Sequence, residues 1–379
     1  MNKTPFNIAG LDGGGFIIKK CGGSAPSASR WTGHADAEGL KAIGWTDEDI
    51  AYYQEHGVNW NAEDDEYHKV TDDNKALYGV LTASNISDYK ERIVYLPKID
   101  TSNMRSMESM FSGYSSLVGI PQLDTSSVTS MSYMFQNCYS LVSIPQLDTS
   151  SVTSMGTMFK NCYSLVGIPQ LDTSSVTSMG NMFYGCYSLV SIPQLDTSSV
   201  TSMNNMFDGC YSLVGIPQLD TSSVTSMSFM FNGCRSLVGI PQLDTSKVKN
   251  MGSMFSNCYS LVGIPQLGTS SVTNMGNMFS ACYSLVGIPQ LDTSKVTIMS
   301  SMFSACYSLV HVNLKNASKA YQLNNSALLS KESLLYIINN EAATSAITIK
   351  LASYAYTRLS TDPDIEAALA AHPNISIAQ

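Results

Sequence analysis

PQLDTSSVTSMSYMFQNCYSLVSI, residues 121–144, is the stretch that decides the fold, because it starts again almost unchanged at Pro145. Nine copies of 24 residues follow one another without insertion or deletion. Their prolines are Pro97, Pro121, Pro145, Pro169, Pro193, Pro217, Pro241, Pro265 and Pro289. A fixed period of this length is the sequence signature of a solenoid, in which each coil stacks on its neighbours.

Two patterns of apolar residues alternate within each copy. Leu141, Ile144 and Leu147 frame a short extended segment, and the next apolar residues recur at the spacing of one helix face. Asp124 precedes that face, where an N-cap residue belongs. The helix-spaced residues are Val128, Met131, Met134, Phe135 and Cys138. We therefore predict an α/β solenoid over residues 93–312, built from nine strand–helix coils with a parallel sheet on one face.

The repeats are flanked by two different kinds of sequence. Residues 1–30 are rich in Gly and Ser and predict a flexible arm. Residues 31–92 hold all three tryptophans and predict a small helical N-terminal module. Residues 313–379 predict a C-terminal αβ cap that covers the last coil.

The predicted cap contains four elements. A helix is expected at 330–340 with Ser330 as its N-cap, followed by a strand at 346–352. A second helix is expected to begin with Pro363 at its first position, and a last strand at 374–379.

Eight of the nine cysteines occupy one repeat position. They are Cys138, Cys162, Cys186, Cys210, Cys234, Cys258, Cys282 and Cys306. Stacked coils place them in one column at about 4.8 Å spacing, with parallel side chains that do not favour disulfides. Free buried thiols are the preferred interpretation, and disulfides or a metal site are the alternatives.

Two further columns invite metal hypotheses. The aspartates of the Asp124 column are interpreted as helix caps, with calcium binding as the alternative. The two methionines of each copy, Met131 and Met134 in the copy quoted above, are interpreted as core residues rather than as soft-metal ligands. No histidine recurs with the repeats to serve as a base for a Ser or Cys nucleophile. We therefore predict no cofactor, no metal site and no enzyme activity.

Aromatic residues supply the candidate binding sites. One column follows the cysteines and consists of Tyr139, Tyr163, Tyr187, Tyr211, Arg235, Tyr259, Tyr283 and Tyr307. It is interpreted either as a stabilising ladder or as a strip of rings that binds sugars or a protein. A second set lies at the few positions that vary between copies, on the outward face of the expected helix. Its aromatic members are Tyr133, Tyr184 and Phe229. This variation is interpreted either as drift of a loosely constrained surface after duplication or as recognition by this face, with the strand face as scaffold; our hypothesis is that these residues contribute to binding.

The reading Cys-x-x-Leu-x-x-Ile-Pro-x-Leu, followed by Val-x-x-Met-x-x-Met-Phe-x-x-Cys, resembles the BspA-like, or Treponema-type, leucine-rich repeat. The resemblance covers residues 93–312. It implies a curved solenoid with a parallel sheet on one face and short helices on the other. It also implies adhesion to host cells, matrix or microbes, or recognition at a bacterial or phage surface.

The composition argues against some classes of binding partner. Charged residues make up 13% of the chain and the net charge is −9, which argues against binding nucleic acid. No run of 18 apolar residues predicts membrane insertion, and the first residues lack the apolar stretch of a secretory signal.

We therefore expect a recognition or adhesion protein that is made in the cytoplasm and carried in the virion of a phage of gut bacteria. It would bind a surface protein or glycan through the solenoid and contact virion proteins through its N-terminal region. The alternative is a bacterial cell-surface or secreted BspA-like adhesin.

Overall fold

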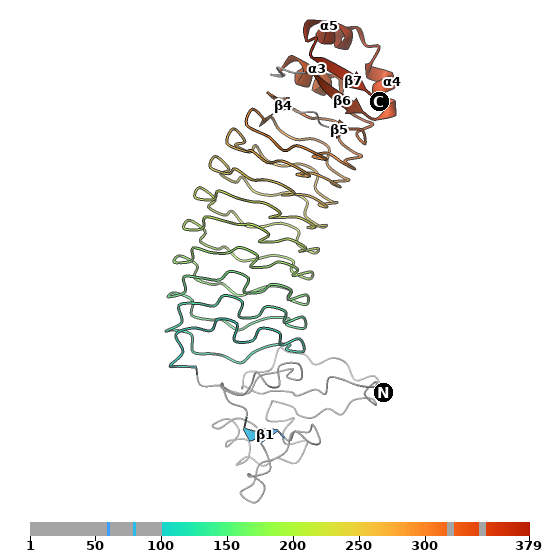
Figure 1. Ribbon diagram of the computed structural model, residues 1–379. Helices are drawn as coiled ribbons and strands as arrows, with labels where there is room; N and C mark the ends of the chain where they lie inside the picture. The colour runs from blue at the N-terminus through green and yellow to red at the C-terminus, as the bar shows by residue number, and fades with distance from the viewer. Residues whose placement is uncertain (1–58, 61–78, 81–100, 317–321, 341–345) are drawn as a thin grey trace, which may run out of the picture.

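The computed structural model shows an elongated, gently curved stack of coils that ends in a group of helices and strands (Figure 1). The residues that the structure describes are 59–60, 79–80, 101–316, 322–340 and 346–379. The predicted arm lies outside the described residues. Of the predicted N-terminal module, only β1 (Asn59–Trp60) and β2 (Gly79–Val80) are described, and these two strands pair antiparallel.

Backbone hydrogen bonds between successive coils hold the stack together. On one side of the coil, alternate N–H groups donate to the next coil, as from Met131 to the Ser154 carbonyl at 3.0 Å and from Phe135 to the Met158 carbonyl at 2.9 Å. The N–H groups between them close four-residue turns instead, as from Met134 to the Met131 carbonyl. The coils therefore meet through short parallel bridges, of which Ser130 with Ser154 is one.

The predicted helix in each coil is wrong. The described repeats contain no α-helix, because two positions of every coil have left-handed backbone, as at Tyr133 (φ 60°) and Asn137 (φ 61°). A right-handed helix cannot pass through such residues. Consecutive four-residue turns bring a side chain back to the interior at every third or fourth position, and this spacing imitates that of a helix face.

The predicted strand is also mostly replaced by looser pairing. Among the described residues of the repeats, only β3 (Leu291–Asp292) and β4 (Leu314–Lys315) form a ladder, in parallel, near the end of the stack. In earlier coils this side is joined by single backbone bonds, such as that from the Val142 N–H to the Val118 carbonyl at 3.0 Å.

The core consists of identical side chains stacked in columns along the axis. The Val, Met, Phe, Cys and Leu positions of the repeat are buried in successive coils. Neighbouring Phe rings lie 5.6–5.9 Å apart and nearly parallel. The methionines therefore belong to the core, as predicted.

The cysteine column lies in this core as free thiols, which confirms the preferred interpretation. Each thiol donates to a Phe carbonyl of the preceding coil, as from Cys186 Sγ to the Phe159 carbonyl at 3.1 Å. Burial raises the pKa of these thiols, so they stay protonated at neutral pH.

The C-terminal elements continue the core beyond the last coil. In the sheet β5-β6-β7 all strands are parallel, and their apolar residues join the same buried cluster as the coils. The elements are β5 (Gln322–Leu323), α3 (Lys331–Asn339), β6 (Ile347–Leu351), α4 (Ser353–Leu359), α5 (Pro363–Ala371) and β7 (Ile375–Ala378).

The four elements expected in this region are confirmed. Ser330 caps α3 by accepting from the Ser333 N–H, and α5 begins at Pro363. The short α4 was not predicted, since its N-cap Ala352 has no capping side chain. No helix among the described residues is both long and apolar enough to cross a lipid bilayer.

The left-handed positions make a direct test of the turn geometry possible. Gly209 has φ +76°, whereas Gly215 in the same coil lies outside the left-handed region and has open space where a Cβ would be. Gly209→Ala should lower the free energy of unfolding by about 1–2 kcal/mol, because an L side chain is strained at that φ.

Gly215→Ala is the matched control and should leave stability unchanged or raise it by about 0.4–1 kcal/mol. Chemical denaturation of both variants checks the prediction. Equal effects at the two positions would contradict the turn geometry.

Candidate binding face of the solenoid

The tyrosine column is a continuous stack along one edge of the solenoid. Neighbouring ring centroids lie 4.5–4.7 Å apart in most pairs, and the last pair, Tyr283 and Tyr307, lies at 5.6 Å. Arg235 fills the one position without a ring, with its guanidinium carbon 4.0 Å from the Tyr211 centroid and 5.5 Å from that of Tyr259. The guanidinium is planar and stacks on aromatic faces, so it preserves the column.

This stacking decides what the column offers to a ligand. The faces of the rings are covered by their neighbours, whereas Tyr139, Tyr187, Tyr283 and Tyr307 are still 37–56% exposed. Burial and the adjacent hydroxyls of Tyr163 and Tyr211 raise the pKa of Tyr187. The column therefore presents ring edges and a row of hydroxyl groups to solvent.

Two further columns lie on the same side of each coil. Every coil from Val118 to Val310 has valine three residues after the tyrosine position, and those at 166–286 are 42–51% exposed. Glutamine follows four residues later and is exposed. The tyrosine–valine–glutamine face consists of the Tyr139–Tyr307 column with Arg235, the Val142–Val286 column and the Gln122–Gln266 column.

The glutamines are fixed by hydrogen bonds between coils. The Nε2 group of Gln146 donates to the Gln170 carbonyl at 2.5 Å and to the Leu147 carbonyl at 3.2 Å, and the other glutamines of the column repeat this pattern. Both amide donors are therefore used. Among the described residues nothing donates to the Oε1 atoms, so they form an ordered row of acceptors that faces solvent.

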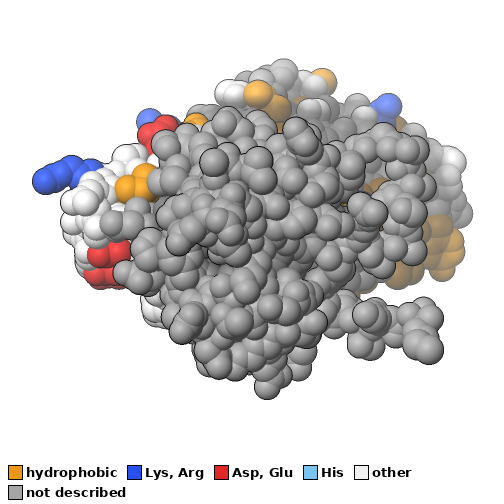
Figure 2. Space-filling view, turned by 90° about the horizontal axis from the view of Figure 1, so that it is seen from below, with side chains coloured by type: hydrophobic (Ala, Val, Ile, Leu, Met, Phe, Trp, Pro, Cys, Tyr) orange, Lys and Arg blue, Asp and Glu red, His pale blue; other side chains and the backbone are white. Residues whose placement is uncertain are grey.

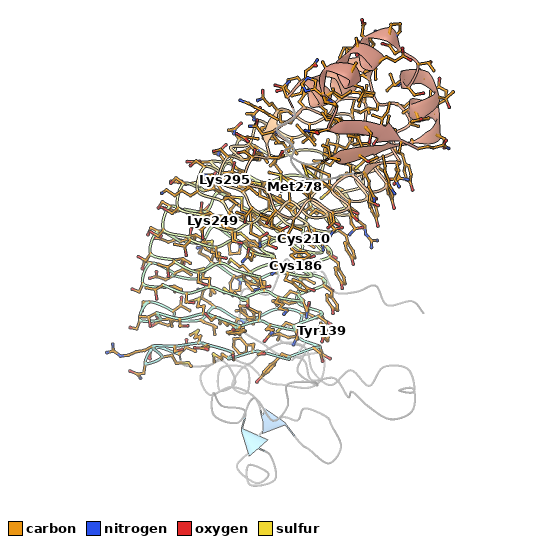
Figure 3. All side chains as sticks on the ribbon, turned by 45° about the horizontal axis from the view of Figure 1, so that its top comes forward. Tyr139, Cys186, Cys210, Lys249, Met278 and Lys295 are labelled. Atoms are coloured by element: carbon orange, nitrogen blue, oxygen red, sulfur yellow. The ribbon has the colours of Figure 1, made fainter. Side chains whose placement is uncertain are left out.

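The figures place this face at one margin of the array. Figure 3 labels Tyr139 at the right edge and Lys249 and Lys295 at the left. Viewed from below, hydrophobic side chains are visible at the right and upper margins with a few at the left, and Lys, Arg, Asp and Glu side chains lie mainly at the left (Figure 2).

The variable aromatic residues lie on turns, away from this face. Tyr133 and Phe229 occupy left-handed positions and are each 41% exposed. Tyr184 occupies a different repeat position and is half-buried, with the Lys160 ammonium 4.9 Å from its ring centroid. They lie in alternate coils, with one coil between each and the next, so the structure does not bring them together.

The aspartate column shapes turns. The Asp148 carboxylate accepts from the Ser150 N–H at 3.1 Å and from its hydroxyl at 2.7 Å, and these bonds lower the pKa of Asp148. This is the hydrogen-bond pattern of a cap, but it closes a turn and no helix follows. In the part of the chain that the structure describes, no three His, Cys, Asp or Glu residues are grouped to hold a metal ion.

Sequence reasoning selected the tyrosines and missed the valines and glutamines. Their signal was available, because both positions are unchanged from copy to copy although nothing buries them.

Arg235 permits a test of the column. Arg235→Ala opens a gap between Tyr211 and Tyr259 and should cost about 0.5–1 kcal/mol of stability through loss of the cation–π contacts. Arg235→Tyr should restore continuous stacking and recover that loss. Thermal unfolding measures both; a Tyr variant as unstable as the Ala variant would show that stacking does not stabilise the column.

A second prediction concerns pH. Burial raises the pKa of Asp208 to about 6, although Asn232 donates to its carboxylate at 2.8 Å. The folded chain therefore binds this proton more tightly than the unfolded chain, and stability falls as the pH rises from about 4 through 6. Asp208→Asn should raise the melting temperature at pH 7.5 by about 2 °C and have no effect below pH 4.

Asp148→Asn is the control of opposite sign. Its lowered pKa contributes stability above the unfolded pKa, so that variant should melt at a lower temperature at pH 7.5. Shifts of the same sign in the two variants would contradict these assignments.

Four overlapping segments of the chain match the family model described as "Mycoplasma protein of unknown function, DUF285", at residues 82–190, 165–262, 186–286 and 239–331. Among solved structures, a T. pallidum leucine-rich-repeat protein is 28% identical, with a TM-score of 0.35 over 44% of this chain and 77% of that one. A TLR13–ssRNA13 complex is 12% identical, with a TM-score of 0.27 over 79% of this chain and 45% of that one. No curated protein is similar in sequence. Because the matched residues make up more than half of the chain, this protein belongs to the DUF285 family.

Proposed function

We propose that the protein is a non-enzymatic recognition or adhesion protein that binds a surface protein or glycan through the outer surface of its solenoid. The supporting observation is the invariance of two exposed columns. The exposed valines and glutamines are the same in every copy from the second to the eighth, whereas the position of Tyr133 and Phe229, which is 41% exposed in those two coils and buried as Thr157 and Ser253 in two others, changes between copies.

This invariance argues for selection on the exposed valines and glutamines. All copies share the same history of duplication, so drift alone would alter exposed residues in every column. The valines at 166–286 are still 42–51% exposed, so burial alone does not explain why they are retained. A requirement for binding explains why the valine stays.

The rigid surface also suits recognition. Backbone bonds, the glutamine bonds and the stacked rings fix the outward groups before any partner arrives. A partner then binds without the loss of side-chain freedom that weakens most interfaces.

For the biological setting we propose the virion of a phage of gut bacteria, with the N-terminal region contacting other virion proteins. The low charge of the chain suits an extended particle component. The second candidate is a bacterial cell-surface or secreted adhesin, and the description of the family from Mycoplasma, a bacterium, favours it.

Fractionation of the producing culture separates the two settings. Filtered particles and washed cell envelopes are probed for the chain with an antibody. In the virion setting the chain sediments with particles that contain capsid protein. Recovery in the envelopes or the free medium, and not in particles, would establish the adhesin instead, and retention in the soluble cell extract would contradict both.

A further inference from the structure

We propose that the tyrosine–valine–glutamine face binds a neutral, linear polysaccharide that lies along the solenoid axis, with successive sugars on successive coils. This inference rests on the proposed function and specifies its ligand class and its site. Three properties of this face support it: the regular spacing of its residues from coil to coil, the chemical groups that it presents, and its charge.

The period points to a ligand that itself repeats. The ring centroids of the tyrosine column follow one another at 4.5–4.7 Å in most pairs, and the valines and glutamines recur with the same coils. Each step thus presents the same three groups in the same order. A folded protein has a non-repeating surface and would favour different residues in different coils, whereas a linear polymer requires equal groups at equal steps.

The chemistry points to sugars among linear polymers. A pyranose ring has apolar C–H faces and a rim of hydroxyl groups. The face matches this arrangement, because its apolar valine stripe lies between two polar rows. Sugar C–H groups can pack on Val166 and its equivalents, sugar hydroxyls can donate to the Oε1 atoms of the Gln170 column, and the hydroxyls of the Tyr163 column can donate or accept.

The glutamine row explains why such binding would be effective. A mobile glutamine loses rotamer freedom when it binds a ligand, but here each Nε2 is already held by two carbonyls, at 2.5–2.7 Å and 3.1–3.4 Å. The carbonyl end is left as the acceptor. Immobilised groups of this kind raise affinity by reducing the entropy lost on binding.

The charge excludes polyanions. Between the tyrosine and aspartate positions of the coils from residue 139 to 292, Arg235 is the only cation, and it is stacked between two rings. The aspartate column flanks the glutamines with one carboxylate per coil, apart from Gly268. Acidic polysaccharides and nucleic acids would be repelled along this edge, which leaves neutral chains.

The test compares two triple variants that add the same charge to the same three coils. Val190→Glu, Val214→Glu and Val238→Glu alter the proposed face. Thr177→Glu, Thr201→Glu and Thr225→Glu, which are also exposed, alter the other side. The probes are soluble cellulose derivative, β-1,4-mannan, β-1,3-glucan and amylose in affinity gel electrophoresis, followed by calorimetry with oligosaccharides of the retarding polymer. Circular dichroism and thermal melting confirm that both triple variants are folded.

We expect at least one polymer to retard the wild-type chain and affinity to rise steadily with oligosaccharide length. The valine triple should bind at least about tenfold more weakly and the threonine triple within about twofold of wild type. Retardation by none of the polymers, affinity that stops rising at two sugars, or equal loss in both triples would overturn the proposal.

A binding assay with intact gut-bacterial cells distinguishes the polysaccharide proposal from the broader proposal that the solenoid recognises a surface partner. If the wild-type chain binds cells and the valine triple binds equally well, the partner lies elsewhere on the solenoid, and recognition stands without this face. If binding is lost when cell-surface protein is digested, the partner is a protein. If the wild-type chain binds no cells or particles, the recognition function itself fails.

Discussion

The structure depends on the requirement that backbone groups at the coil interface find a partner in the next coil. Buried N–H and C=O groups are costly when unpaired, and the solenoid has almost no regular helix or sheet with which to pair them. Alternate N–H groups on the Met131–Asn137 side reach forward to the next coil, and those of Thr129 and Val142 reach back to the preceding one. Since this pairing works only when every coil has the same length, the strict 24-residue period follows from it.

Much of this architecture could be predicted from sequence, because repetition reveals columns. The buried cysteines and methionines, the stacked tyrosines and the capped helix α3 follow from periodicity and local signals. The helix in each coil could not be distinguished from a series of turns, since both bring an apolar side chain inward at every third or fourth position. The difference lies in the backbone of Tyr133, a bulky residue that rarely adopts a left-handed conformation and gave no warning that it would do so here.

The second left-handed position of each coil, that of Asn137, gives a clearer sequence signal for left-handed backbone. Its residues are Asn137, Asn161, Gly185, Gly209, Gly233, Asn257, Ala281 and Ala305, mostly the types that tolerate such backbone. Aromatic residues drew attention to one candidate binding column. The valines and glutamines beside it are unchanged from copy to copy, but only their exposure and hydrogen bonds showed that they form a surface. The valine and glutamine columns repeat the same groups outward at every step, as do the columns of Ser126 and, apart from Lys249, of Thr129, whereas the position of Tyr133 varies.

The hydrogen bonds between coils also determine how the protein would respond to a pulling force. They run along the axis, so tension applied between the two ends of the stack passes through every interface in series, and a terminal coil, which has a neighbour on one side only, is the first to detach. Coils would then detach singly, and each would release 24 residues, or roughly 80 Å of extended chain. A tether of this design lengthens in equal steps under load and keeps its remaining coils intact, which protects an attachment from sudden rupture in flowing liquid.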